Sequence, residues 1–239
     1  CINNFLNLLK KDDQKTLDQD VKTEIFNQLL DIGFSERSCE VAKATVDDVL
    51  GSLDKDLLGE IKNLYKSEGT FHFRKSFMTP VIALNLSKKL SWVTESNKEA
   101  LILSSLFNDR ELTDEQMHFF STEADVDISA LSEIEKGIVT NHAKKAADWA
   151  KLQKDLPIEV ERIVRQHHGS PTGIGFFTEL PAQITQLSML FIVAEEFSSG
   201  VLLSASGKLD AGELIQDISK KYSNKKIDKI LEILIQSLK

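Results

Sequence analysis

The sequence predicts an all-α protein, a helical bundle with a small N-terminal helical region. Apolar residues recur at helical spacing in successive segments, as in the run that carries Ile227, Ile230, Leu231 and Leu234. Sustained alternation of apolar and polar residues, which is typical of half-buried strands, is absent from the sequence. Capping residues and glycines separate the apolar segments, so most of the chain is expected to form helices joined by loops.

The first 68 residues are predicted to form the N-terminal helical region, which serves as a packing module or a linker. Gly33 is suited to end one of its helices, while Ser35 and Asp54 are suited to cap the next two. The polar residues 67–70 make the best boundary in this part of the sequence. A second domain is therefore expected to cover residues 69–239.

The second domain is predicted to bring charged side chains to the ends of buried helices. One dense apolar run ends abruptly in Asn108-Asp109. Pro181 is expected to open a helix that is apolar on nearly every side, and therefore buried, with Glu195 and Glu196 at its far end. A carboxylate that follows a buried helix needs a partner or water, so these residues are candidates for an internal site.

Composition restricts the class of partner and the compartment. The chain has 239 residues, 41% of them hydrophobic, and its formal net charge of -8 argues against nucleic acid as the main partner. Cys1 and Cys39 form neither a metal-binding spacing nor a disulfide framework, which favours a cytoplasmic location. No apolar run of about 18 residues is evident, so no membrane span is expected. Because the chain begins at Cys1, without a methionine or a signal-peptide pattern, we expect it to be an excerpt of a longer protein.

The most distinctive stretch holds two adjacent histidines, His167 and His168, followed at once by a loop rich in glycine. Pro157 opens an amphipathic run that is predicted to be a helix ending at this pair. Two imidazoles at a helix end, beside a loop that can approach a ligand closely, are typical of a binding site. Taken alone, the stretch is equally compatible with a polar helix end that carries two surface histidines.

Several features follow one another in a particular order along the second domain: a carboxylate at a helix end, a lone histidine, the histidine pair, a loop with glycines and an aromatic residue, and a late glutamate. The residues are, in that order, Asp109; His142; His167 and His168; Gly173, Gly175 and Phe176; and Glu195. This order resembles the HD-GYP family of the HD superfamily, over roughly residues 72–205. Members of that family are all-helical, metal-dependent phosphodiesterases of the bacterial messenger cyclic di-GMP.

The resemblance implies a metal site. The residues that match metal ligands of the family are Asp109, His142, His167 and His168. Three imidazoles and a carboxylate suit an ion of Fe, Mn or Zn. Glu195 matches a late aspartate ligand of the family, with Glu196 as the other alignment, and Gly173, Gly175 and Phe176 match its nucleotide loop.

The sequence departs from the family pattern mainly in one half of the family's two-metal site. Asn108 replaces the histidine of the His-Asp pair, and no histidine lies near Arg74–Phe77, where the family has its first one. His72 is close to that window but out of register. The lysine that follows the pair in the family is also missing, Gly169 replaces a glutamate, and Phe176 lacks the hydroxyl of the family's tyrosine. Since hydrolysis at a two-metal site needs both ions, these losses imply that ordinary hydrolysis is lost.

The resemblance therefore implies a catalytically inactive signalling domain that binds a partner protein, with cyclic di-GMP as a second candidate ligand. An active cyclic di-GMP phosphodiesterase with an unusual metal site is one alternative. A metal-free structural domain is another, in which Asn108, Arg165 and Glu195 form hydrogen bonds in the emptied cavity. One bound ion of Fe, Mn or Zn and no metal at all are equally compatible with the sequence, which also allows a homodimer.

Overall fold

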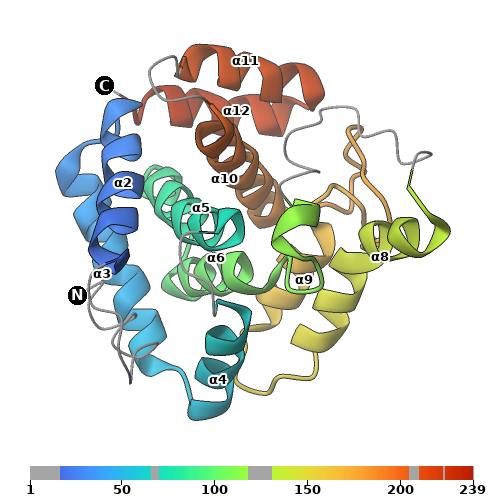
Figure 1. Ribbon diagram of the computed structural model, residues 1–239. Helices are drawn as coiled ribbons and strands as arrows, with labels where there is room; N and C mark the ends of the chain where they lie inside the picture. Colours follow the sequence, from blue (N-terminus) through green and yellow to red (C-terminus); the bar gives the residue numbers. More distant parts are fainter. Residues whose placement is uncertain (1–16, 66–69, 118–130, 205–209, 223, 239) are drawn as a thin grey trace.

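The computed structural model of the chain describes residues 17–65, 70–117, 131–204, 210–222 and 224–238. In these ranges the regular structure is helical and contains no strand, which confirms the predicted all-α class (Figure 1). The proposed boundary at residues 67–70 falls largely outside the described residues. The division of the chain at residue 68 stays a prediction.

Within residues 17–65, the described part of the N-terminal region, three helices are present, and their ends follow the predicted capping residues. The helices are α2 Leu17–Asp31, α3 Glu36–Ser52 and α4 Lys55–Leu64. Gly33 has a φ of 107°, a conformation that favours glycine, at the turn after α2. Side-chain oxygens of Ser35 and Asp54 accept hydrogen bonds from the backbone N–H groups three residues later, at the starts of α3 and α4.

The longer helices in the rest of the described chain form the body of the molecule. They are α5 Phe71–Ser87, α6 Glu95–Phe107, α8 Glu133–Ala150, α9 Ile158–Gln166, α10 Gln186–Leu203, α11 Ala211–Lys221 and α12 Lys225–Ile235. The prediction that Pro181 opens the buried helix is wrong. That helix begins at Gln186, because the Thr185 hydroxyl caps it by accepting from the Ser188 N–H, whereas residues 181–184 form a turn.

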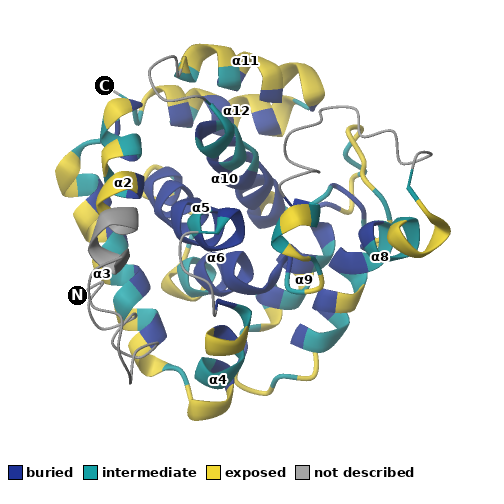
Figure 2. Ribbon diagram, viewed as in Figure 1, coloured by how far each residue is buried: buried dark blue, intermediate teal, exposed yellow. Residues whose placement is uncertain are grey.

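Helix α10 lies at the centre of this arrangement, packed against α5, α9, α11 and α12 (Figures 1 and 2). It is long and apolar enough to cross a membrane by length and composition, and 67% of it is buried inside the molecule. Its apolar side chains are therefore accounted for by packing against neighbouring helices, as predicted for a core helix. Because α10 is buried, its residue Glu195 also lies in the interior.

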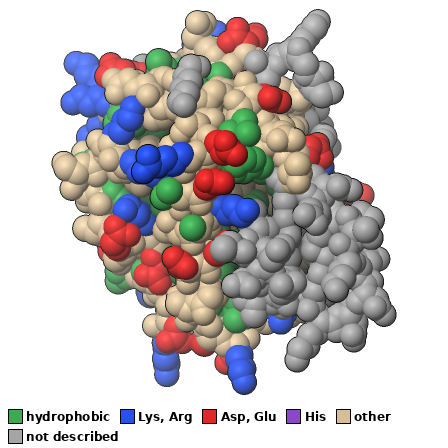
Figure 3. Space-filling model, turned by 90° about the vertical axis from the view of Figure 1, so that its left-hand side faces the viewer, with side chains coloured by type: hydrophobic (Ala, Val, Ile, Leu, Met, Phe, Trp, Pro, Cys, Tyr) green, Lys and Arg blue, Asp and Glu red, His purple; other side chains and the backbone are tan. Residues whose placement is uncertain are grey.

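The hydrophobic core continues from the N-terminal helices into the body. Leu50 of α3, Ile61 of α4 and Met78 of α5 belong to one buried apolar cluster. The surface carries charge of both signs, and on the face shown in Figure 3 acidic and basic side chains are interspersed. This mixture suits a folded domain without a large basic patch on that face.

A buried polar contact also joins the end of α4 to α5 and α6. The Tyr65 hydroxyl lies 2.8 Å from both Ser76 Oγ and the Leu106 carbonyl oxygen. His72 packs edge-on against the Tyr65 ring, with centroids 5.0 Å apart. Burial lowers the pKa of His72 to about 4, although the Asp109 carboxylate opposes the shift. His72 is thus a neutral core residue in the folded protein at neutral pH.

Truncation of Phe191 tests the central position of α10. Phe191 is fully buried, so Phe191→Ala is expected to lower the free energy of unfolding by about 3–5 kcal/mol. Ile235→Ala is the matched control, because Ile235 is 55% exposed at the end of α12 and its truncation should cost about 0.5 kcal/mol or less. Urea unfolding measures both variants. Equal losses would contradict the central placement of α10.

Titration of His72 should make the fold sensitive to acid. The unfolded chain takes up a proton near pH 6.5, whereas folded His72 does so only near pH 4. The contribution of neutral His72 to the free energy of unfolding is therefore fully present above pH 6.5. It is lost as the pH falls towards 4, by up to about 3 kcal/mol. His72→Gln should reduce this loss. Urea unfolding of chelator-treated protein at pH 7.5 and pH 4.5 measures the difference, and an unchanged pH dependence would contradict a buried neutral His72.

Candidate metal centre

Three separate segments bring the predicted metal ligands together. Asp109 follows the C-terminal end of α6, His142 lies in α8, and His167 and His168 follow the last residue of α9. One ligand atom from each of the four residues lies within 4.8 Å of every other. The predicted set of Asp109, His142, His167 and His168 therefore forms one compact cluster that could hold a metal ion.

The adjacent histidines lie side by side at the C-terminal end of α9. Neighbours on a helix diverge by about 100°, so two consecutive side chains in its interior would point apart. His167 is the C-cap of α9, and His168 belongs to the turn that follows. The centroids of the two rings are 3.9 Å apart.

The imidazoles of His142 and His167 are oriented by backbone carbonyl groups. Nδ1 of His142 lies 2.6 Å from the Val139 carbonyl oxygen, and Nδ1 of His167 lies 2.6 Å from that of Val164. A carbonyl oxygen only accepts hydrogen bonds, so each Nδ1 carries a proton and each Nε2 is the nitrogen that faces the cluster. This is the tautomer in which Nε2 can bind a metal ion.

The spacing within the cluster is close to that of ligands around one ion. Nε2 of His142 lies 3.2 Å from Nε2 of His167 and 3.0 Å from Nε2 of His168. Two nitrogens bound tetrahedrally to one zinc ion at about 2.0–2.1 Å would be roughly 3.3 Å apart. Oδ1 of Asp109 adds a fourth donor, 3.4 Å from His142 and 3.5 Å from His167. The donor set and its spacing therefore fit one ion of Fe, Mn or Zn.

The electrostatic environment favours the ligating forms of Asp109 and His168. Burial opposes ionisation of Asp109, but the Lys75 ammonium, together with the neighbouring imidazoles of His142 and His167, outweighs it and holds the pKa of Asp109 well below its usual range. Burial and the neighbouring His167 and His142 hold the pKa of His168 well below its usual range. Burial also disfavours charge on His167, yet the carboxylates of Glu195 and Asp109 raise its pKa.

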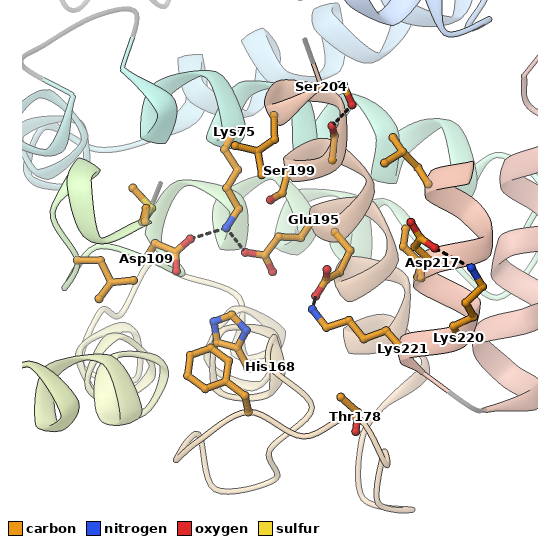
Figure 4. A pocket seen from close by; sticks show the side chains of 18 of the residues that line it. Lys75, Asp109, His168, Thr178, Glu195, Ser199, Ser204, Asp217, Lys220 and Lys221 are labelled. Atoms are coloured by element: carbon orange, nitrogen blue, oxygen red, sulfur yellow. Dashed lines mark hydrogen bonds and ion pairs between the residues drawn. The ribbon is translucent and has the colours of Figure 1, made fainter. Parts of the chain in front are cut away.

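A lysine that the sequence analysis did not single out occupies the other side of Asp109. The Lys75 ammonium lies 2.8 Å from Asp109 Oδ2 and 2.7 Å from Glu195 Oε1 (Figure 4). The Asn108 amide donates to the same two oxygens, at 3.0 Å and 2.7 Å respectively. Lys75, Asp109 and Glu195 are only 7%, 2% and 5% exposed. Together with Asn108, these three side chains form a buried cluster, which we call the lysine–carboxylate cluster.

Burial and charge act in opposite directions on Lys75. Burial by itself would lower the pKa of the ammonium group, but the carboxylates of Asp109 and Glu195 raise it above its ordinary value. Lys75 therefore carries a full positive charge in the folded protein. It stands inside the window Arg74–Phe77, where the resemblance calls for the family's first histidine.

The structure decides between the two glutamates and corrects one expectation. Glu195 faces the cluster, whereas Glu196 binds Lys221 Nζ at 2.6 Å and the Tyr222 hydroxyl at 2.7 Å. Asn108 and Glu195 are hydrogen-bonded, as expected for a metal-free cavity. Arg165 does not join them, because its guanidinium is held by Asp148 and Glu161 outside the cluster.

The glycine loop is fixed to α8 at the edge of the site. The Gly175 N–H donates to the Thr140 carbonyl oxygen at 2.8 Å, and the Lys144 N–H donates to that of Gly173 at 3.0 Å. Gly173 has a φ of 76°, and a Cβ there would lie 2.9 Å from the Lys144 backbone. The loop then places the Phe176 ring against His168, with centroids 4.3 Å apart.

A cavity of about 830 Å³ opens beside both clusters. Its walls include Lys75, Asp109 and His168 on one side and Lys221 of α11 on the other (Figure 4). This volume lies within the range of small-molecule sites, about 300–1,000 Å³. The donor cluster therefore borders a space large enough for a ligand.

Comparison with known proteins rests on the fold. No protein-family model matches the sequence, and no curated protein matches it. Among solved structures, a HDG"Y"P protein from Bdellovibrio bacteriovorus, Bd1817, is similar with a TM-score of 0.52 and 14% sequence identity. The similarity covers 98% of this chain and 76% of that one. The chain thus has an HD-GYP-like fold, in agreement with the resemblance found in the sequence.

Proposed function

We propose that this chain is a catalytically inactive, HD-GYP-like signalling domain that holds one metal ion and acts by binding a partner protein. The observation that carries the proposal is the Lys75 ammonium between Asp109 and Glu195. It occupies the side of Asp109 opposite the histidines. Asp109, His142, His167 and His168 are the proposed ligands of the single ion, which would supply a Lewis acid to the cavity.

The lysine–carboxylate cluster argues against two-metal hydrolysis. Such hydrolysis uses two ions about 3.5–4 Å apart that hold the attacking and the leaving oxygen. An ammonium group offers positive charge but no coordination position for water. Asn108 adds a neutral amide, and Phe176 offers no hydroxyl to a substrate. The residues around Asp109 therefore support recognition of a ligand rather than its cleavage.

The loop beside the cavity supports a binding role. Ile174, Phe176 and Phe177 are each more than 40% exposed, although they are large and apolar. Apolar side chains at the mouth of a site commonly contact a ligand or a partner. We propose cyclic di-GMP as the candidate small ligand, because the cavity is of suitable size and Phe176 presents an aromatic ring that a base could stack on.

An active cyclic di-GMP phosphodiesterase is the second candidate function. The cavity beside the histidines favours it, because a substrate there would lie next to the proposed ion. In this alternative Lys75 would neutralise charge on a phosphate instead of completing a buried ion pair. Its contacts with two carboxylates make that role the weaker one.

Metal content tests the proposed centre. Protein purified without a chelating tag is expected to contain about one ion of Fe, Mn or Zn per chain by elemental analysis. His168→Gln should lose most of it, because one of three imidazoles is removed. His72→Gln is the matched control, since His72 is buried outside the cluster, and it should keep the ion. Metal-free wild-type protein, or equal metal loss in both variants, would contradict the proposal.

Turnover tests the absence of hydrolysis. Wild-type protein supplied with Mn or Fe is expected to leave cyclic di-GMP intact, as followed by chromatography of the nucleotide. Binding without turnover, measured by calorimetry, would support the ligand role. Turnover that disappears in Asp109→Asn would establish the phosphodiesterase alternative instead.

A further inference from the structure

We propose that Lys75 fills a latent second cation site, made by Asp109, Glu195 and Asn108, and that removal of its ammonium group opens this site to a divalent ion. The inference rests on the proposed function, because it assumes that the histidine cluster (Asp109, His142, His167 and His168) holds the first ion. It goes further by assigning a second set of metal ligands that the native chain keeps closed.

The Lys75 ammonium group lies beside one of the two oxygens of Asp109. Oδ1 of Asp109 faces His142 and His167, whereas Oδ2 faces Lys75. A carboxylate with this orientation can join two cations, one at each oxygen. Lys75 Nζ is the cation on the second side, at 2.8 Å (Figure 4).

Oxygen donors surround the position of the ammonium group. Glu195 Oε1 lies 2.7 Å from Lys75 Nζ, so two carboxylate oxygens converge on it. Asn108 donates its amide N–H to the same two oxygens. Without the ammonium group, rotation of the Asn108 side chain would present its carbonyl oxygen in place of the nitrogen. Three oxygen donors of this kind suit Mn²⁺ or Mg²⁺.

The charges at this position also favour a cation. Asp109 and Glu195 contribute two negative charges, and Lys75 contributes one positive charge, all nearly buried. Loss of the ammonium charge leaves Glu195 and the Oδ2 side of Asp109 in the interior without a cation beside them, which is unfavourable. A divalent ion restores the balance and can be coordinated by the same oxygens. In the native chain, the ammonium group of Lys75 therefore neutralises the carboxylate charge that a second ion would otherwise neutralise.

Lys75→His tests the inference, because it removes the ammonium group and adds a nitrogen donor. Elemental analysis after dialysis against Mn²⁺ is expected to give about two ions per chain, compared with one in wild-type protein. Electron paramagnetic resonance should then show a spin-coupled manganese pair, since ions that share Asp109 would lie about 3.5–4 Å apart. Lys75→His/Glu195→Gln should return to one ion.

Lys75→Met is the matched control. It removes the charge but fills the space with an apolar chain, so it should keep one ion. If circular dichroism shows that Lys75→His does not fold, Lys75→Asn serves in its place, because its shorter amide leaves room for a hydrated ion. A folded Lys75→His or Lys75→Asn variant that still binds a single ion would overturn the inference and leave Lys75 as an ion-pair partner only.

The same measurements separate this inference from the proposed function. Wild-type protein with two ions, or with none, contradicts the single-ion centre. A gain of one ion in Lys75→His, over a wild-type content of one, supports the latent site. No gain, with one ion in wild type, leaves the proposed function standing and refutes the latent site.

Discussion

The geometry of the site depends on the Asp109 carboxylate, whose two oxygens face two different environments. One oxygen faces the imidazoles of His142 and His167, and the other faces the Lys75 ammonium group. A buried carboxylate is stable only when its charge is compensated, and here the compensation comes from both sides. The ammonium group keeps Asp109 ionised, and an ionised Asp109 is what the histidine cluster needs in order to bind a cation.

The ends of two helices position the side chains of this site. Asp109 follows the end of α6, and the histidine pair follows the last residue of α9, so both helix ends deliver side chains to the same point. Helix α10 contributes Glu195 from its buried length, which is an unfavourable place for a carboxylate. Lys75 and Asn108 resolve this cost by binding Glu195, so the core helix and the site stabilise each other.

Sequence patterns predicted the all-α class and the caps at Gly33, Ser35 and Asp54, and the family resemblance predicted the four members of the histidine cluster. They succeeded because apolar periodicity and capping are local, and because His167 and His168 are adjacent in the chain. Lys75 was missed because a lysine inside an apolar helix shows its role only when Asp109 and Glu195, 34 and 120 residues later, are placed beside it. Arg165 was assigned to the cavity because it lies two residues before His167 in the sequence. In the structure its partners are Asp148 of α8 and Glu161 of α9, away from the cluster.

The Tyr65 hydroxyl gives the N-terminal helices a mechanical connection to the site. It binds Ser76, the residue after Lys75, and the carbonyl group of Leu106, two residues before Asn108. A rigid displacement of α4 would have to break a buried hydrogen bond or carry α5 and α6 with it. If α5 and α6 were carried by different amounts, Lys75 would shift relative to Asp109, so strain applied at α4 would reach the buried charges at the centre of the molecule.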